Sequence, residues 1–118
     1  MTPEGKVKAK VSKLLKAYGV YYFMPVQTGF GAAGLDYHCV FPGGKAFFIE
    51  TKAYGKNPTY RQDELIVTLR VLGCEVFIIN NDTKLAELER YVDANSTYKY
   101  TIDVNVSNTG KRGVHLPK

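Results

Sequence analysis

Apolar residues recur with the period of a helix near the N-terminus. One face carries a stripe at steps of four, three, one and three, formed by Val7, Val11, Leu14, Leu15 and Tyr18. Thr2 can cap the first turn, Pro3 suits the first helical position, and Gly19 is placed to stop the helix. The pattern therefore predicts a helix that begins at Pro3 and ends before Gly19.

Two more helices are predicted further along the chain. Thr59 and Gln62 form a capping box at the start of a helix over 59–72, which Gly73 ends. We expect its buried stripe to consist of Leu65, Ile66, Leu69 and Leu72. Polar residues at 81–83 cap a third helix that runs to about residue 94, with four residues facing inward: Leu85, Leu88, Tyr91 and Val92.

The stretches between these helices have the composition of strands. They cover residues 21–26, 35–41, 45–52 and 74–79, with a less defined alternating stretch at 98–106. Pro25 marks the first as an edge strand or as the place where pairing ends. Pro42-Gly43-Gly44 joins the next two as a hairpin. The strand at 74–79 is nearly all apolar and is expected inside the sheet.

This order predicts an α/β fold with a restriction-endonuclease-like core, in which a central mixed β-sheet is flanked by α-helices in the order α-β-β-β-α-β. At 118 residues we expect a single domain, with a core over 1–95 and a C-terminal strand and basic tail over 96–118. Since no apolar run approaches the roughly 20 residues of a membrane span, no membrane partner is expected. Cys39 and Cys74 are interpreted as free thiols of a cytoplasmic protein.

The chain is basic, with sixteen Lys and Arg against eleven Asp and Glu, a net charge of +5 and a pI near 9.2. Five lysines fall in the first 16 positions, and Lys111, Arg112 and Lys118 lie near the C-terminus. Nucleic acid is the commonest polyanionic partner of such a protein, although a lysine-rich helix face can equally be only solvated.

The candidate catalytic residues lie on the hairpin formed by residues 35–41 and 45–52. Successive side chains of a strand alternate between faces, so Glu50 and Lys52 point the same way while Thr51 points away. Pairing of the two strands can place Asp36 beside Glu50. Two carboxylates and one ammonium on one patch are costly for a core and useful for a metal site. This arrangement suggests hydrolysis of a phosphodiester.

Four motifs in order resemble the virus-type replication-repair nuclease (VRR-NUC) family of the PD-(D/E)xK nuclease superfamily: Glu4 in the first helix, Gly34-Leu35-Asp36, Ile49-Glu50-Thr51-Lys52, and Gln62 opening the second helix. The resemblance implies Mg²⁺, with Mn²⁺ as a substitute, held by Asp36, Glu50, the Thr51 carbonyl and Glu4. Lys52 would orient or deprotonate the attacking water, or stabilise developing charge, and Gln62 would reach the same site.

Each of these residues also has a structural interpretation. Asp36 could cap a turn, Glu50 and Lys52 could form a surface ion pair, Glu4 could complement the helix dipole, and Gln62 could serve only the capping box. His38 lies two residues after Asp36, and a packed strand histidine is favoured over a metal ligand. Tyr54 and Tyr60 could contact DNA or pack against the helix.

The resemblance implies a structure-selective DNA endonuclease that acts as a homodimer on branched DNA, in the manner of a Holliday-junction resolvase. It also implies a role in DNA repair, and small stand-alone domains of this family resemble phage proteins. The alternative is a non-catalytic DNA-binding module that keeps the nuclease-like fold. A sequence-specific restriction enzyme would need recognition loops, which the sequence does not show. The one spare segment is the tail from Ser96, which could instead add to a dimer interface.

Overall fold

The structure is a computed structural model, and it describes residues 1–26, 34–96, 101–103 and 113–115. Its elements in chain order are α1 (Pro3–Ala17), β1 (Tyr21–Phe23), β2 (Tyr37–Val40), β3 (Ala46–Thr51), α2 (Tyr60–Val71), β4 (Glu75–Ile79), α3 (Asp82–Asn95), β5 (Thr101–Asp103) and β6 (Gly113–His115). The predicted α-β-β-β-α-β order is confirmed. β1 is shorter than expected, since pairing stops two residues before Pro25.

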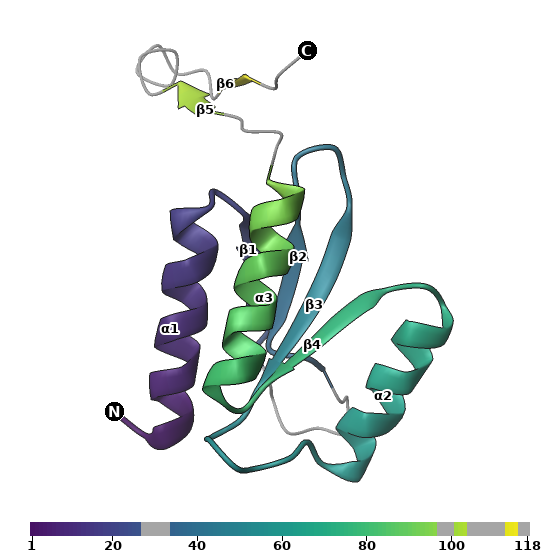
Figure 1. Cartoon of the computed structure of the whole chain (residues 1–118). Coiled ribbons are helices and arrows are strands. Elements are labelled where there is room, and N and C mark those ends of the chain that lie inside the picture. The colour runs from purple at the N-terminus through teal and green to yellow at the C-terminus, as the bar shows by residue number, and fades with distance from the viewer. Residues whose placement is uncertain (27–33, 97–100, 104–112, 116–118) are drawn as a thin grey trace.

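The central sheet has the strand order β1-β2-β3-β4 (Figure 1). β1, β2 and β3 pair antiparallel, and β3 pairs parallel with β4, so the sheet is mixed as predicted. β5 and β6 form a separate antiparallel pair. The sequence predicted a strand where β5 lies but not β6, and the remainder of the stretch at 98–106 and most of the basic tail lie outside the described residues.

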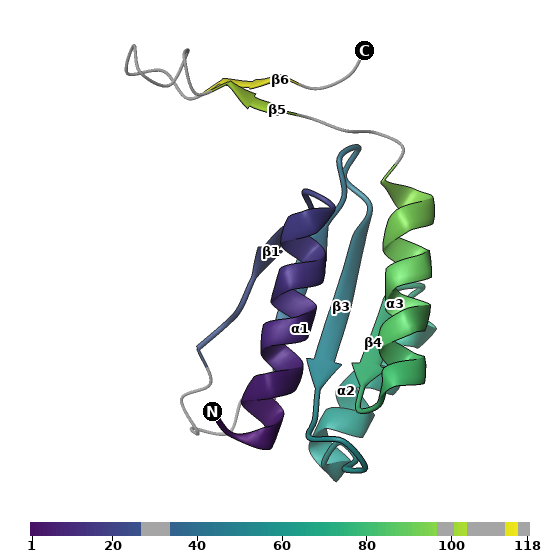
Figure 2. The same ribbon diagram turned by 60° about the vertical axis from the view of Figure 1, so that its left-hand side comes forward.

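The helices cover both faces of the sheet (Figures 1 and 2). α1 and α3 lie together on one face, where the larger core includes Val11 and Leu15 of α1, Leu88 of α3, and Tyr37 and Phe47 of the sheet. α2 lies on the other face over a smaller core, made by Leu35, Ile66 and Val76 with partly buried neighbours. Alternate residues of β3 therefore face different helices, so Glu50 and Thr51, which are neighbours in the chain, have different surroundings.

The predicted buried stripe of α2 is wrong at one end. Ile66 is buried and Leu65 and Leu69 are partly buried, but Leu72 is 73% exposed. Leu72 is the C-cap residue, and Gly73 follows it in the left-handed conformation (φ 94°), so the chain turns back toward β4 at this point. Cys74 and Val76, which follow this turn, belong to the smaller core instead.

All three helices of the described core begin at the same end of the sheet, the end at which β3 and β4 finish (Figures 1 and 2). We call it the carboxyl end of the sheet. The cap side chains Thr2, Thr59 and Asn81 each accept a hydrogen bond from a backbone N–H in the first turn. The positive ends of three helix dipoles are therefore directed toward this end, which favours negative charge there.

The two cysteines are free thiols, as predicted. Burial raises the pKa of the Cys39 thiol to about 12, so this thiol stays protonated near neutral pH and is no nucleophile. No helix among the described residues is long and apolar enough to cross a membrane.

Candidate active site

Asp36 and Glu50 lie beside each other at the carboxyl end of the sheet. The hairpin register pairs Tyr37 with Ile49, so the next position along the two chains sets Asp36 opposite Glu50. The Asp36 N–H donates to Glu50 Oε1 over 3.2 Å. Glu50 is 1% exposed and Asp36 is 9% exposed. Two acidic residues are thus withdrawn from water in one place. The hairpin predicted that they lie side by side, and Asp36 does not merely cap a turn.

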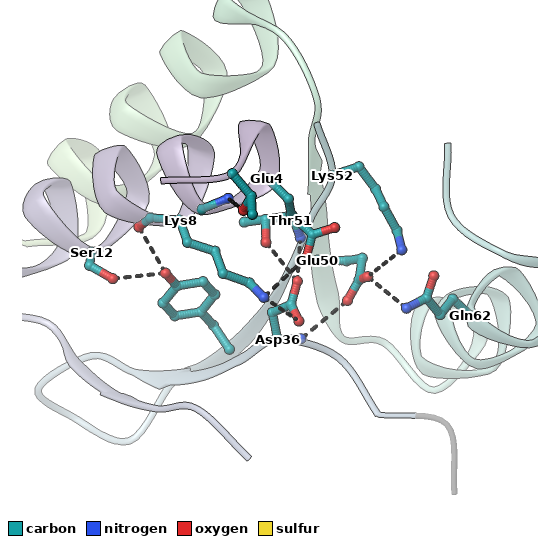
Figure 3. Close-up of polar contacts among 11 residues, drawn as sticks. Glu4, Lys8, Ser12, Asp36, Glu50, Thr51, Lys52 and Gln62 are labelled. Atoms are coloured by element: carbon teal, nitrogen blue, oxygen red, sulfur yellow. Dashed lines mark hydrogen bonds and ion pairs between the residues drawn. The ribbon is translucent and has the colours of Figure 1, made fainter. Parts of the chain in front are cut away.

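Lys52 lies on the same side of β3 as Glu50. Its Nζ is 3.4 Å from Glu50 Oε2, and its side chain is 16% exposed (Figure 3). Because Glu50 is buried, this contact differs from a surface ion pair, whose partners are both solvated and which contributes little. The lysine compensates a carboxylate that would otherwise be buried without a cation.

Thr51 points to the opposite face, as the alternation predicted, yet it belongs to the same site. Its backbone N–H and its hydroxyl both donate to Asp36 Oδ2, over 2.9 Å and 2.6 Å. Asp36 directly precedes β2, and its carboxylate is held from the α1 side while Glu50 is held from the α2 side. The sequence pointed to the Thr51 carbonyl and did not reveal this hydroxyl contact.

Lys8 is a site residue that the sequence analysis left among the solvated lysines. Its Nζ lies 3.1 Å from Glu4 Oε2 and 3.6 Å from Asp36 Oδ1, so it bridges the two carboxylates (Figure 3). Glu4 therefore joins the site through Lys8. Burial acts to lower the pKa of Lys8, but its bond to Glu4 and the Asp36 charge outweigh this effect and the pKa is raised. The spacing of four residues between Glu4 and Lys8 was the available signal.

A buried tyrosine fixes the turn of α1 that carries Lys8. The Tyr37 hydroxyl donates to the Lys8 carbonyl oxygen over 3.0 Å and lies 2.8 Å from the Ser12 hydroxyl. Burial raises the pKa of the Tyr37 hydroxyl, so it remains a donor at neutral pH. These contacts hold α1 against β2 and so set where Lys8 meets Asp36.

Gln62 performs both roles that the sequence offered for it. Its Oε1 accepts a hydrogen bond from the Thr59 N–H over 2.9 Å, completing the capping box. Its Nε2 donates to Glu50 Oε2 over 2.7 Å. One amide therefore caps the first turn of α2 and also positions the Glu50 carboxylate. The two interpretations from the sequence are compatible.

The protonation of Glu50 is displaced from its ordinary range. Burial and the nearby Asp36 charge raise the pKa of Glu50 from 4.5 to about 7, although Lys52 and the Asp36 N–H act in the opposite direction. A carboxyl group near half-ionisation at neutral pH is one that a cation would readily deprotonate, since the cation favours the charged form.

The donor chemistry fits Mg²⁺. Among the described residues no three His, Cys, Asp or Glu side chains gather closely enough to form a metal cluster. Mg²⁺ needs fewer, since it is commonly held by one or two carboxylates with water completing the shell. Asp36 and Glu50 supply these oxygens.

His38 is exposed, and its ring packs edge-on against Phe48 and Phe23. This packing favours a structural role for His38 over that of a metal ligand.

Comparisons with known proteins bear on the fold. No family model matches the chain, and no curated protein matches it in sequence. A solved structure described as a "VRR_NUC domain" is similar with a TM-score of 0.66 and 23% sequence identity, over 75% of this chain and 95% of that chain. The alignment spans nearly all of that domain, and the expected resemblance is confirmed at the level of the fold. The chain has the nuclease-like fold of a VRR_NUC domain.

Proposed function

We propose that this protein is a magnesium-dependent endonuclease that hydrolyses phosphodiester bonds in DNA. The observation that carries the proposal is the burial of Asp36 and Glu50 side by side, with the Lys52 ammonium on Glu50. Burying charged groups costs free energy, and groups buried together in this way cluster at functional sites. The trio also lies on a fold like that of a VRR_NUC domain.

Mg²⁺ would be held by Asp36, Glu50 and the Thr51 carbonyl, with Glu4 at the outer side beside Lys8. The ion would neutralise phosphate charge and increase the acidity of water, and Mn²⁺ can substitute for it. Thr51 and Gln62 keep the two carboxylates in place, because each donates to a carboxylate oxygen over less than 3 Å.

Lys52 is the residue placed to act on the attacking water or on the phosphate. Its ammonium reaches the site from the position directly after β3 and remains partly open to solvent. Hydrolysis adds a hydroxyl group to phosphorus and breaks the bond to the leaving oxygen, which gains a proton. As an ammonium, Lys52 would orient the water or stabilise charge on the phosphate, and only as the neutral amine could it accept the proton of the water. Lys8 would relieve the negative charge around Asp36.

The carboxyl end of the sheet suits a DNA backbone. Three helices begin there, and basic residues stand on the segments that meet there: Lys6, Lys8, Lys10, Lys52, Lys56 and Arg61. These features attract phosphate without reading bases. We therefore propose recognition by shape, with branched DNA of the four-way-junction type as substrate and a homodimer as the working form.

Support for pairing between copies comes from β1, which has only β2 as a neighbouring strand among the described residues and exposes Tyr21 and Phe23.

A cleavage panel tests the proposal. We expect the purified protein to cut four-way-junction DNA faster than flap, splayed-arm, single-stranded or duplex DNA, with Mg²⁺ or Mn²⁺ and not with chelator. Light scattering on the same preparation should give twice the chain mass. Binding to these DNAs without any chelator-sensitive cutting would instead establish the non-catalytic DNA-binding module. A monomer that cuts at full rate would show that the homodimer is not the working form.

The double role of Gln62 can be separated by two substitutions. Gln62→Glu keeps an acceptor for the Thr59 N–H but places a carboxylate against Glu50, so we expect cleavage to fall by about tenfold or more. Thr59→Ala removes only the cap, which should lower the free energy of unfolding by about 1 kcal/mol and leave cleavage unchanged. Urea unfolding and initial cleavage rates measure both. Equal cleavage by Gln62→Glu and wild type would remove Gln62 from the site.

A further inference from the structure

A pocket of about 220 Å³ lies on the flank of α1 that faces away from Lys8. Its lining consists of Pro3, Lys6, Val7, Lys10 and Tyr54. We propose that this pocket binds one unpaired nucleotide of the substrate strand, with the base on the Tyr54 ring and its phosphate on Lys6 and Lys10. The proposal rests on the proposed function, since it assumes a DNA substrate, and it adds a required feature of that DNA.

The Tyr54 ring is a fixed and accessible wall. The Tyr54 hydroxyl donates to Asp82 at the start of α3 and accepts a hydrogen bond from Lys10 Nζ over 3.3 Å. Both contacts involve the hydroxyl, so the orientation of the ring is set, while the residue remains 41% exposed. An exposed aromatic ring that is already held in place loses little conformational entropy when a base stacks on it.

The lysines give the pocket its preference for a nucleotide over an uncharged ring compound. Lys10 Nζ lies 5.0 Å from the Tyr54 ring centroid and 3.9 Å from an Asp82 carboxylate oxygen, so its charge is partly compensated. Lys6 is exposed and pairs with no carboxylate in the described part of the chain. One uncompensated ammonium beside an apolar and aromatic lining matches the two parts of a nucleotide, the phosphate and the base.

The pocket and the carboxylate site are built from the same two segments. Tyr54 follows Lys52 by two residues, and Pro3 and Val7 alternate along α1 with Glu4 and Lys8. A strand with its scissile phosphate near Lys52 can therefore continue toward Tyr54. The volume is below the range of pockets for drug-sized ligands, so it admits one base and not a base pair. The base must already be unpaired or must leave its duplex.

Binding without cleavage tests this subsite directly. The full chain with Lys52→Met is titrated, in chelator, with two duplexes that carry 2-aminopurine, a fluorescent base that dims when it stacks. The base is unpaired in one duplex and paired in the other. We expect tighter binding and quenching for the unpaired base. Tyr54→Ala should weaken that binding by about tenfold or more and abolish the quenching, with paired duplex affected much less. Tyr54→Phe should keep the quenching, since the ring remains.

Two further variants make the result specific. Leu72→Ala removes an exposed apolar side chain at the C-terminal end of α2, away from the pocket and from β1, and should change neither affinity nor quenching. Lys6→Ala should reduce the salt dependence of binding. Equal affinity of Tyr54→Ala and wild type for the unpaired DNA would overturn the subsite even if the wild type cleaves DNA. Conversely, Tyr54-dependent quenching in a protein that never cleaves would uphold the subsite and reject the proposed nuclease.

Discussion

Lys52→Met and Asp36→Asn should each lower magnesium-dependent DNA cleavage on the order of a thousandfold, because the first removes the ammonium beside Glu50 and the second removes a charged oxygen ligand. Both replacements preserve the volume of the side chain, so the fold should survive. Initial cleavage rates with saturating Mg²⁺ measure the effect, and circular dichroism with urea unfolding verifies the structure.

Lys56→Met provides the matched control for the loss of one positive charge. Lys56 follows Lys52 by four residues in the same loop, but it is exposed. We expect its replacement to change cleavage only a few-fold, with the difference disappearing as salt is raised. Cleavage by Lys52→Met or Asp36→Asn within tenfold of the wild-type rate, in protein that is correctly folded, would falsify the assignment of the site.

The stability of the metal-free protein should fall as pH rises from about 4.5 to 7. Within this window the folded state keeps a proton on Glu50 that the unfolded state has already lost, because burial and Asp36 raise the folded pKa to about 7. The unfolded state binds fewer protons, so the free energy of unfolding decreases with pH, by about 3 kcal/mol in total. Urea unfolding in chelator at several pH values measures this slope.

Glu50→Gln isolates this effect from the other titrating groups. The amide cannot ionise, so the variant should lack this part of the slope and should be more stable than wild type at pH 8 in chelator. Added Mg²⁺ should then stabilise the wild type at pH 8, because it binds the ionised carboxylate, and should stabilise the variant much less. An identical pH slope in the two proteins would show that Glu50 keeps an ordinary pKa.

Local signals in the sequence determined most of the fold. The caps at Thr2, Thr59 and Asn81 form as predicted, because each needs only a hydrogen bond to a backbone N–H in its own first turn. The hairpin placed Asp36 beside Glu50 because register and alternation are properties of two neighbouring strands. The prediction that Leu72 is buried was wrong because helical periodicity does not reveal where the helix ends, and Leu72 is its C-cap residue.

The parts of the site that the sequence missed depend on how separate elements pack. Lys8 reaches Asp36 only because Tyr37 and Ser12 fix the rotation of α1 over β2. The Thr51 hydroxyl meets Asp36 because the chain bends just before β2, which directs that carboxylate to the α1 side. The four-residue spacing links Lys8 to Glu4 but not to Asp36, and no spacing links the Thr51 hydroxyl to Asp36. Both contacts with Asp36 therefore required a three-dimensional structure.

The helices start together at the carboxyl end of the sheet, and none of the described residues of the candidate site lies at the opposite end of the hairpin. The hairpin tip lies there, where Gly43 and Gly44 are exposed with φ of 98° and 91°, and where an added Cβ would meet no described atom within 4 Å. A fluorophore, an affinity tag or a fused domain inserted at this tip would stay remote from Asp36, Glu50 and Tyr54. A label at this point would allow the proposed binding of DNA to be followed.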